Sequence, residues 1–256
     1  MSDYLQAVLW GLVQGLTEFL PVSSSGHLVI VPEALGVEPP DLAMSAVLHL
    51  GTLAAVIVHY RADLGRLLLR SFADPPTRRL LWLLVLGTLP AGLALVFESQ
   101  LEALQASTTA VGIALVGTGV VLWLSAFAQD GRMSLDRASP LTAVLVGFSQ
   151  LLAVIPGVSR SGMTISTGMA RNLSRHEAAR FSFLLGVPTI AAAGLIEGIE
   201  VVGEGRLGGP ELVGILVAAI SGYAAISVLL RMLERGGLRP FSYYCVVVGV
   251  LTVAFL

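Results

Sequence analysis

The stretch QGLTEFLPVSSSGH, residues 14–27, places a carboxylate, a serine cluster, a glycine and a histidine in an otherwise strongly apolar chain. Polar groups are costly at membrane depth, so they usually mark a functional site there. Pro21 ends any helix that runs through the apolar residues before it. The apolar run 28–35 that follows is shorter than the roughly 20 residues that a spanning helix needs. The stretch therefore predicts a re-entrant hairpin whose tip lines a cavity, and a single span kinked at Pro21 is the alternative.

The second half of the chain repeats this stretch at residues 150–163, which read QLLAVIPGVSRSGM. An offset of 136 (150 − 14) aligns the two glutamines, and it also aligns Val22, Ser23, Ser25 and Gly26 with Val158, Ser159, Ser161 and Gly162. We interpret this as an internal repeat within one membrane domain, 1–256, with copies at about 1–128 and 136–256.

The composition is that of a polytopic membrane protein. Of the 256 residues, 55% are hydrophobic and 12% are charged, whereas a soluble domain typically carries about 25% charged residues. The net charge of −2 provides no basic surface of the kind that binds nucleic acid. The single cysteine, Cys245, permits no disulfide within the chain. The first ~30 residues lack the basic segment of a cleaved signal peptide, so we expect the N-terminus to be retained.

Six further apolar segments are long enough to cross the hydrocarbon core. Three follow the first hairpin, and three follow a second hairpin at about 140–170; the six lie at about 43–60, 80–97, 109–127, 179–198, 211–230 and 240–256. An odd number of crossings in each copy inverts the second copy relative to the first. We therefore expect an all-α integral membrane protein with six transmembrane helices and two re-entrant helical hairpins in an inverted-topology repeat.

The arginines predict the orientation, because cytoplasmic loops are enriched in basic residues. Ten arginines lie in three loops, 61–79, 128–139 and 231–239, whereas 36–42 and 98–107 hold none and 199–210 holds only Arg206. We expect the first three loops to be cytoplasmic, and the other three segments and both termini to lie outside. If 140–170 were a full span, Arg171 and Arg175 would fall outside, so the charges favour a hairpin there.

Hairpins that enter from opposite faces bring their tips together, and the pooled side chains suit a phosphate. The first hairpin contributes Gln14, Glu18, Ser23, Ser24, Ser25, Gly26 and His27, and the second contributes Ser159, Arg160, Ser161, Gly162 and Thr164. Arginine has a planar fork of donors that matches phosphate oxygens, and Ser-Gly turns that open helices present backbone N–H groups to an anion. A serine three residues before a histidine can supply a nucleophile and its base.

Glu18 can transfer protons or hold a divalent cation, with Gln14 one helical turn away on the same face. The alternative reading of the serines and of His27 is structural, since such side chains also make local hydrogen bonds or let helices approach closely. An unpaired arginine at membrane depth is harder to explain in that way.

These two motifs resemble those of the undecaprenyl-diphosphate phosphatase family, also known for bacitracin resistance, and the resemblance covers essentially the whole chain. It rests on QGLTEFLPVSSSGH at 14–27 and PGVSRSGMTIS at 156–166. It implies an enzyme of the bacterial cytoplasmic membrane that hydrolyses a C55 isoprenoid diphosphate at the outer face and recycles the lipid carrier of peptidoglycan synthesis. The residues that match the family's catalytic set are Glu18, Ser24, His27 and Arg160.

The resemblance also implies a divalent cation, Mg²⁺ or Ca²⁺, with Glu18 as its protein ligand. Gln14 stands where the family has Glu or Gln, and two carboxylates would hold a metal more firmly than one. The remaining tip residues are assigned to substrate binding: Gln14, Ser23, Ser25, Gly26, Ser159, Ser161, Gly162 and Thr164. The expected partners are a polyprenyl diphosphate lipid, membrane lipid and, as a homodimer, a second copy of the chain.

Two other functions compete with a phosphatase. A transporter or flippase for an isoprenoid phosphate lipid would also use inverted repeats with broken helices. A structural scaffold would leave the buried glutamate, histidine and arginine unexplained. Within the phosphatase reading the sequence leaves open whether Ser24 attacks phosphorus, with His27 accepting its proton, or whether His27 activates a water molecule.

Overall fold

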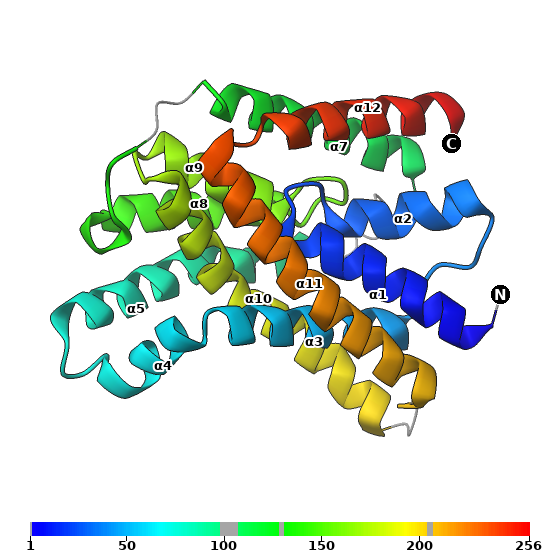
Figure 1. Ribbon diagram of the computed structural model, residues 1–256, viewed down its shortest axis with the longest axis horizontal. Coiled ribbons are helices and arrows are strands. Elements are labelled where there is room, and N and C mark those ends of the chain that lie inside the picture. The colour runs from blue at the N-terminus through cyan, green and yellow to red at the C-terminus, as the bar shows by residue number, and fades with distance from the viewer. Residues whose placement is uncertain (1, 98–106, 128–130, 204–206) are drawn as a thin grey trace.

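The computed structural model describes residues 2–97, 107–127, 131–203 and 207–256, and over these ranges it is helical without a β-strand (Figure 1). The first half contains α1 (Asp3–Phe19), α2 (Ser24–Leu35), α3 (Leu42–His59), α4 (Arg61–Arg70), α5 (Pro75–Thr88), the 3-10 helix η1 (Leu89–Phe97) and α7 (Thr108–Ser125). The second contains η2 (Leu135–Arg137), α8 (Pro140–Leu152), α9 (Arg160–Ala170), α10 (Arg175–Gly203), α11 (Gly209–Arg235) and α12 (Arg239–Phe255). The all-α prediction is confirmed.

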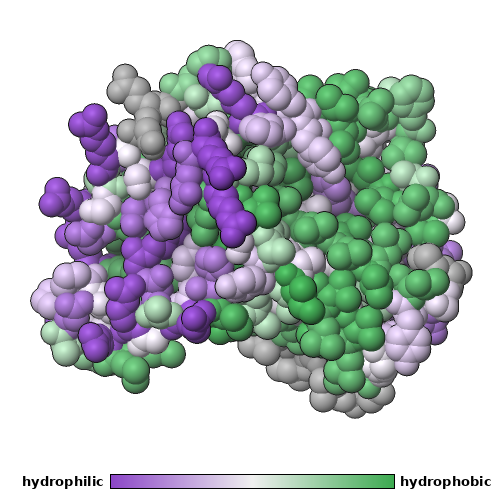
Figure 2. All heavy atoms as spheres, viewed as in Figure 1, coloured by the Kyte–Doolittle hydropathy of each residue, from purple (hydrophilic) through white to green (hydrophobic). Residues whose placement is uncertain are grey.

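Apolar helices support a membrane protein. In the described part of the chain, α7 and α11 are long and apolar enough to cross a membrane, and α3 with α4 makes a third if this pair, bent by 76°, is one span. Large apolar side chains of α11 face outward, among them Leu216 at 61% and Ile220 at 71% exposure. Figure 2 shows hydrophobic residues over much of one face, with hydrophilic residues gathered at the side where α4 and α5 lie.

A helix lies at each of the six ranges where the sequence predicts a span: α3, α5 with η1, α7, α10, α11 and α12. The two predicted hairpins correspond to α1 with α2 and to α8 with α9, and each is broken at its proline-containing segment. Of the segments used to predict orientation, 98–106, 128–130 and 204–206 lie outside the described residues, and Arg206 is among them.

Two hydrogen bonds join the arginine-rich segments on one side of the molecule. Arg79 Nη2 donates to the carbonyl oxygen of Ala138 at 2.8 Å. Arg175 Nη1 donates to the carbonyl oxygen of Leu233 at 3.4 Å. Both chain termini lie at the opposite side, away from α4 and α5 (Figure 1). This arrangement agrees with an arginine-rich face and a separate face that carries the termini.

Glycine lets α1 pack directly against α11. A Cβ atom at Gly15 would collide with the Ser221 hydroxyl and would lie 2.6 Å from the carbonyl oxygen of Ala218. Close backbone approach at small residues is the usual way that membrane helices associate. Trp10 and Phe19 on α1 are fully buried around this contact. The contact fixes the helix that carries the first motif.

We expect Gly15→Ala to lower the free energy of unfolding by about 1–3 kcal/mol, the usual cost of overpacking a core. Gly117→Ala is the matched control, because this glycine lies inside α7 and a methyl group added to it would have no atom within 4 Å. An alanine there should leave stability unchanged or raise it slightly. Thermal unfolding in detergent measures both variants, and equal shifts would contradict the close packing of α1 on α11.

Candidate active site at the two hairpin tips

The two tips share one local hydrogen-bond pattern. The N–H of Gly26 donates to Ser23 Oγ at 3.3 Å and caps α2, and the N–H of Gly162 donates to Ser159 Oγ at 3.1 Å and caps α9. In each tip a second hydroxyl lies 3.3 Å from the capping one, at Ser25 in the first and at Ser161 in the second. These are residues that the offset of 136 aligns, so the repeated sequence forms the same capping hydrogen bonds twice, although the backbone differs, with a φ of +69° at Ser23 and −81° at Ser159.

The tips contact each other directly. Ser161 Oγ donates to the carbonyl oxygen of Leu20 at 3.2 Å. A Cβ atom at Gly26 would lie 3.1 Å from the Cα atom of Gly157, which itself has a φ of +93°. Glycine is therefore needed in both tips. Gly26 permits the close approach, and Gly157 adopts a backbone conformation that other residues rarely take.

Glu18, near the end of α1, joins the two hairpins. Its Oε1 accepts a hydrogen bond from Arg160 Nη2 at 2.6 Å. Its Oε2 accepts from Ser24 Oγ at 2.6 Å and from Gln14 Nε2 at 3.1 Å. The side chains of Glu18 and Arg160 are only 9% and 15% exposed. An ion pair this deeply buried is favourable only with such additional hydrogen bonds, and removing one partner leaves the other charge uncompensated.

The repeat has different side chains at its functional positions. The offset of 136 aligns Ser24 with Arg160, and these two residues bind the two oxygens of the same carboxylate. The same offset places Val154 opposite Glu18. The first copy therefore supplies the carboxylate and the hydroxyl, and the second supplies the guanidinium.

A small cavity of about 40 Å³ opens between the tips. Its lining comes from both hairpins: Thr17, Glu18, Ser23, Ser24, Ser25, Ala153, Val158, Ser159 and Arg160. On this scale a cavity of about 10–15 Å³ holds one water molecule, so the tip cavity has room for a few waters and a lipid diphosphate needs these side chains to move. The groups that could change partners are Arg160 and Ser24, which both bind Glu18.

His27 lies beside the cavity but does not line it. Its Nδ1 is 2.8 Å from the carbonyl oxygen of Ser23, and its Nε2 is 2.8 Å from the hydroxyl oxygen of Tyr244 on α12. The Ser24 hydroxyl donates to Glu18 and not to His27. The structure thus makes the carboxylate the acceptor for Ser24, and proton transfer from Ser24 to His27 stays a prediction.

Comparison with known proteins identifies the family of the chain. The family model described as bacitracin resistance protein BacA matches residues 7–251, a range that includes both hairpins. The chain belongs to the BacA family. Among its relatives, the undecaprenyl-diphosphatase of Methanosphaera stadtmanae is 37% identical over 271 residues, which cover 99% of this chain and 98% of the relative. That of Carboxydothermus hydrogenoformans is 40% identical over 251 residues, covering 96% and 94%.

The other predicted residues lie around this candidate site at different depths. Thr164 is buried behind Arg160, where its hydroxyl lies 2.6 Å from that of Ser182 and donates to the Arg160 carbonyl oxygen at 2.8 Å. The predicted binding residues that do not line the cavity are Gln14, Gly26, Ser161, Gly162 and Thr164. Gln14 still reaches the site through Glu18, whereas the last four support the backbone of the tips.

Sequence reasoning missed three residues that position the site residues. Thr118 on α7 holds the second tip, because its hydroxyl donates to the Gly157 carbonyl at 2.9 Å and accepts from the Ser159 N–H at 3.2 Å. Gly186 leaves room for the guanidinium, since a Cβ atom there would lie 2.9 Å from Arg160 Cζ. Tyr244 binds His27. Each lies in an apolar helix without a motif, so only the tertiary structure identifies it.

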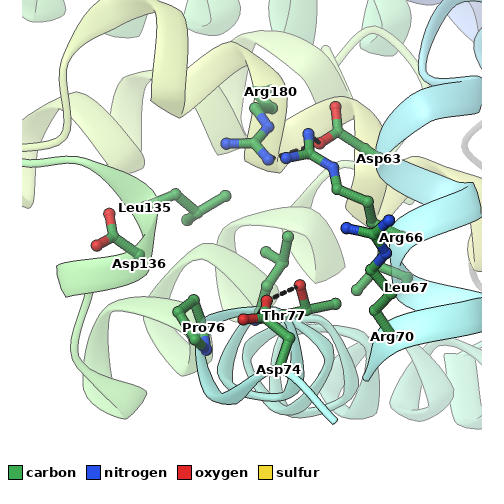
Figure 3. A pocket seen from close by; sticks show the side chains of 11 residues that line it. Asp63, Arg66, Leu67, Arg70, Asp74, Pro76, Thr77, Leu135, Asp136 and Arg180 are labelled. Carbon is green, nitrogen blue, oxygen red and sulfur yellow. Dashed lines mark hydrogen bonds and ion pairs between the residues drawn. The ribbon is translucent and has the colours of Figure 1, made fainter. Parts of the chain in front are cut away.

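A larger cavity of about 440 Å³ lies elsewhere, between α4, the start of α5 and α10 (Figure 3). No residue of either motif lines it. Arg66 and Arg180 both point at Asp63, with ion pairs of 2.7 Å and 2.6 Å. Asp74 caps α5 by accepting from the Thr77 N–H at 3.0 Å. Asp63 is thus paired with both arginines and Asp74 serves as a helix cap, so we interpret this cavity as part of the structure of the arginine-rich loop 61–79.

Few side chains at the tips could act as ligands of a metal cation. The described residues contain no group of three or more His, Cys, Asp or Glu side chains that could hold a metal. Glu18 is the one carboxylate in the lining of the tip cavity. The Oε1 atom of Gln14 is buried without a hydrogen-bond partner, which provides a second oxygen close by. Mg²⁺ commonly binds one or two carboxylates together with substrate phosphates, so these residues fit a cation only when a phosphate ligand shares it.

Proposed function

We propose that this BacA-family protein hydrolyses undecaprenyl diphosphate to undecaprenyl phosphate and inorganic phosphate, and so recycles the lipid carrier of peptidoglycan synthesis. Its relatives of nearly equal length carry the name undecaprenyl-diphosphatase. The observation that carries the proposal is that Arg160 and Ser24, from different hairpins, bind one buried carboxylate at 2.6 Å each. A guanidinium fork and a hydroxyl beside a carboxylate are the groups that phosphoryl transfer from an anionic lipid needs.

In this proposal Arg160 exchanges Glu18 for the diphosphate. The guanidinium can bind two phosphate oxygens in parallel, as it binds carboxylates. Phosphoryl transfer depends mainly on positioning and on charge stabilisation, which Arg160 and the capped N-termini of α2 and α9 supply. The remaining tip hydroxyls that line the cavity, from Ser23, Ser25 and Ser159, complete the binding set.

Ser24 is the proposed nucleophile toward the terminal phosphorus. Its proton passes either to His27, the base that the spacing predicts, or to Glu18, which already accepts the hydroxyl at 2.6 Å; the same group returns the proton to Ser24 when the phosphoserine is cleaved. The anhydride P–O bond breaks, and undecaprenyl phosphate leaves with the bonding electrons. Water then attacks the phosphoserine, releases inorganic phosphate and restores Ser24. His27 serves as the base for water, either in this second step or, if Ser24 only binds the phosphate, in a single direct step.

The proposal includes a divalent cation, Mg²⁺ or Ca²⁺, which Glu18 and the Gln14 amide oxygen would hold when the substrate is bound. Such a cation offsets the charge of the diphosphate when it is bound. With or without the cation, Arg160 binds the phosphates and Ser24 attacks the terminal phosphorus.

We also propose six transmembrane helices and two re-entrant hairpins in the bacterial cytoplasmic membrane, with the site open to the outer face. The helix at each predicted range and the gathering of arginines on one side support this arrangement. A homodimer belongs to the proposal, with no interface residue assigned.

Orientation is testable by cysteine labelling in a Cys245→Ala background. We expect Ala73→Cys to react with an impermeant reagent only from the cytoplasmic side and Glu38→Cys only from outside, since both positions are exposed and the arginine-rich loops face the cytoplasm. Labelling of both from one side would contradict the proposed orientation.

The function itself is tested with purified protein in detergent, where no gradient exists. Release of phosphate from the C55 diphosphate supports the enzyme, and EDTA should slow it if a divalent cation is bound. A transporter or flippase would release none. Absence of release in the presence of Mg²⁺ or Ca²⁺ would contradict the proposal.

A further inference from the structure

His27 is the catalytic candidate that makes no contact with Glu18, Ser24 or Arg160 among the hydrogen bonds at the tips. It is only 5% exposed. Both ring nitrogens have partners at 2.8 Å, the Ser23 carbonyl oxygen at Nδ1 and the Tyr244 hydroxyl at Nε2. The rings of His27 and Tyr244 are nearly parallel, at 11°, with centroids 5.7 Å apart. The imidazole is therefore held from both sides, by its own tip and by α12.

These partners determine the tautomer of His27. A backbone carbonyl oxygen can only accept, so Nδ1 carries the proton. In the neutral ring Nε2 then has the free lone pair and accepts from the Tyr244 hydroxyl. In the protonated ring Nε2 becomes a donor, and the phenol oxygen can rotate its hydrogen away and accept. Tyr244 can thus satisfy Nε2 in both protonation states.

The contact also reaches the backbone beside Ser24. Ser23 has a φ of +69°, which is unusual for a residue other than glycine. Its carbonyl oxygen faces both His27 Nδ1 and the His27 backbone N–H, the latter at 3.2 Å. The orientation of the His27 ring therefore supports the turn that places the Ser24 hydroxyl on Glu18.

We propose that Tyr244 is a positioning residue for the proposed phosphatase reaction, acting through His27. It keeps the His27 ring in the Nδ1–H form and aligned with the first tip. This inference rests on the proposed function. It adds to the proposed active site a residue on α12, a helix that lies outside both sequence motifs.

The titratable groups near this pair are few. Of the elements packed on α2, α7 has no Asp, Glu, Lys, Arg or His in its sequence, and α1 contributes Glu18, which binds Arg160, Ser24 and Gln14. On α12 the neighbouring Cys245 directs its sulfur to the Pro21 carbonyl oxygen at 3.5 Å. Tyr244 is thus the titratable side chain bound to the imidazole, and its removal should change the titration of His27.

The test is Tyr244→Phe, which removes only the hydroxyl. Tyr243→Phe is the matched control, because the two neighbouring tyrosines are exposed at 62% for Tyr243 and 44% for Tyr244, whereas the hydroxyl bound to the buried His27 Nε2 is that of Tyr244. We expect kcat to fall about tenfold, a typical consequence of leaving a buried polar atom without its partner, with little change in KM. Loss of the phenol removes a charge-assisted acceptor from the imidazolium, so the protonated ring is disfavoured more than the neutral one. The acidic limb of the kcat/KM profile should therefore move to lower pH.

Two expected results separate this role from a structural one. Tyr243→Phe should match the parent, and Tyr244→Phe should cause no further loss in a His27→Gln background, because residues that act as a unit are non-additive. An unchanged kcat and acidic limb in Tyr244→Phe would overturn the proposal. So would an additive loss in the double variant.

If the Tyr244→Phe variant fails to fold, an NMR measurement on the wild-type protein still tests the proposal, because it does not depend on activity. In wild-type protein labelled with ¹⁵N-histidine, the four histidines are distinguished by the signal lost in His27→Gln. We expect neutral His27 to carry its proton on Nδ1, and a proton on Nε2 would overturn the proposal. If wild-type protein released no phosphate, the proposed function would fail, whereas normal release with the wrong tautomer would refute only the role of Tyr244.

Discussion

Replacing Ser24 by alanine is expected to lower phosphate release by at least about 1,000-fold, the scale of losing a nucleophile when binding and charge stabilisation remain. Ser24 Oγ lies on Glu18 Oε2 at 2.6 Å, so the hydroxyl has its proton acceptor already in place. The alanine leaves the cavity and the ion pair with Arg160 intact. Steady-state phosphate release in detergent measures the effect.

Ser25→Ala is the matched control for this prediction. Its hydroxyl lines the same cavity but contacts Ser23 at 3.3 Å and not Glu18. Ser25→Ala should lower phosphate release far less than Ser24→Ala, since a single neutral hydrogen bond contributes about 0.5–1.5 kcal/mol. A Ser24→Ala enzyme within about tenfold of the parent would eliminate the covalent route and favour direct attack by water activated by His27.

Replacing Arg160 by lysine is expected to lower turnover by about 100-fold or more, by analogy with the loss of one preorganised donor to a developing oxyanion. Lysine keeps the charge but loses the planar fork. Arg160 is built for this position: Nη2 binds Glu18 at 2.6 Å, Nη1 donates to the Ser182 carbonyl oxygen at 3.4 Å, and Gly186 leaves room for the guanidinium. A lysine ammonium has no planar fork that directs two parallel hydrogen bonds at one phosphate.

Arg171→Lys provides the comparison, because Arg171 is exposed at the end of α9, the helix that Arg160 begins. It should leave turnover near that of the parent. Unfolding temperatures of both variants separate a loss of stability from a loss of catalysis. Near-normal turnover of Arg160→Lys would refute bidentate binding of the diphosphate.

The helices were predictable because their signals are local. Apolar segments of spanning length predict six helices, and a helix lies at each range. Pro21 and the serine turn predict the break between α1 and α2, and the second tip follows from the repeat. In the described part of the chain, length and composition single out α7 and α11 as spans, with α3 and α4 as a bent third.

The site was predictable in its residues but not in its hydrogen bonds. The motifs and the inverted repeat indicate that Glu18, Ser24 and Arg160 come together, and the structure brings them into direct contact. The spacing of Ser24 and His27 suggests a nucleophile with its base, yet the turn at Ser23 directs the imidazole toward α12. Spacing along a chain does not specify side-chain direction in an irregular turn, and Tyr244, 217 residues from His27, has no sequence signal.

The central claim is that the tip site cleaves the anhydride bond of a polyprenyl diphosphate. ³¹P NMR of purified protein with the C55 diphosphate in detergent tests it most directly, because it identifies each phosphorus-containing product. The two diphosphate signals should be replaced by lipid monophosphate and inorganic phosphate in a ratio of one to one, and Arg160→Lys should slow this conversion. Persistence of the diphosphate, or formation of inorganic pyrophosphate by cleavage of the lipid C–O bond, would contradict the account.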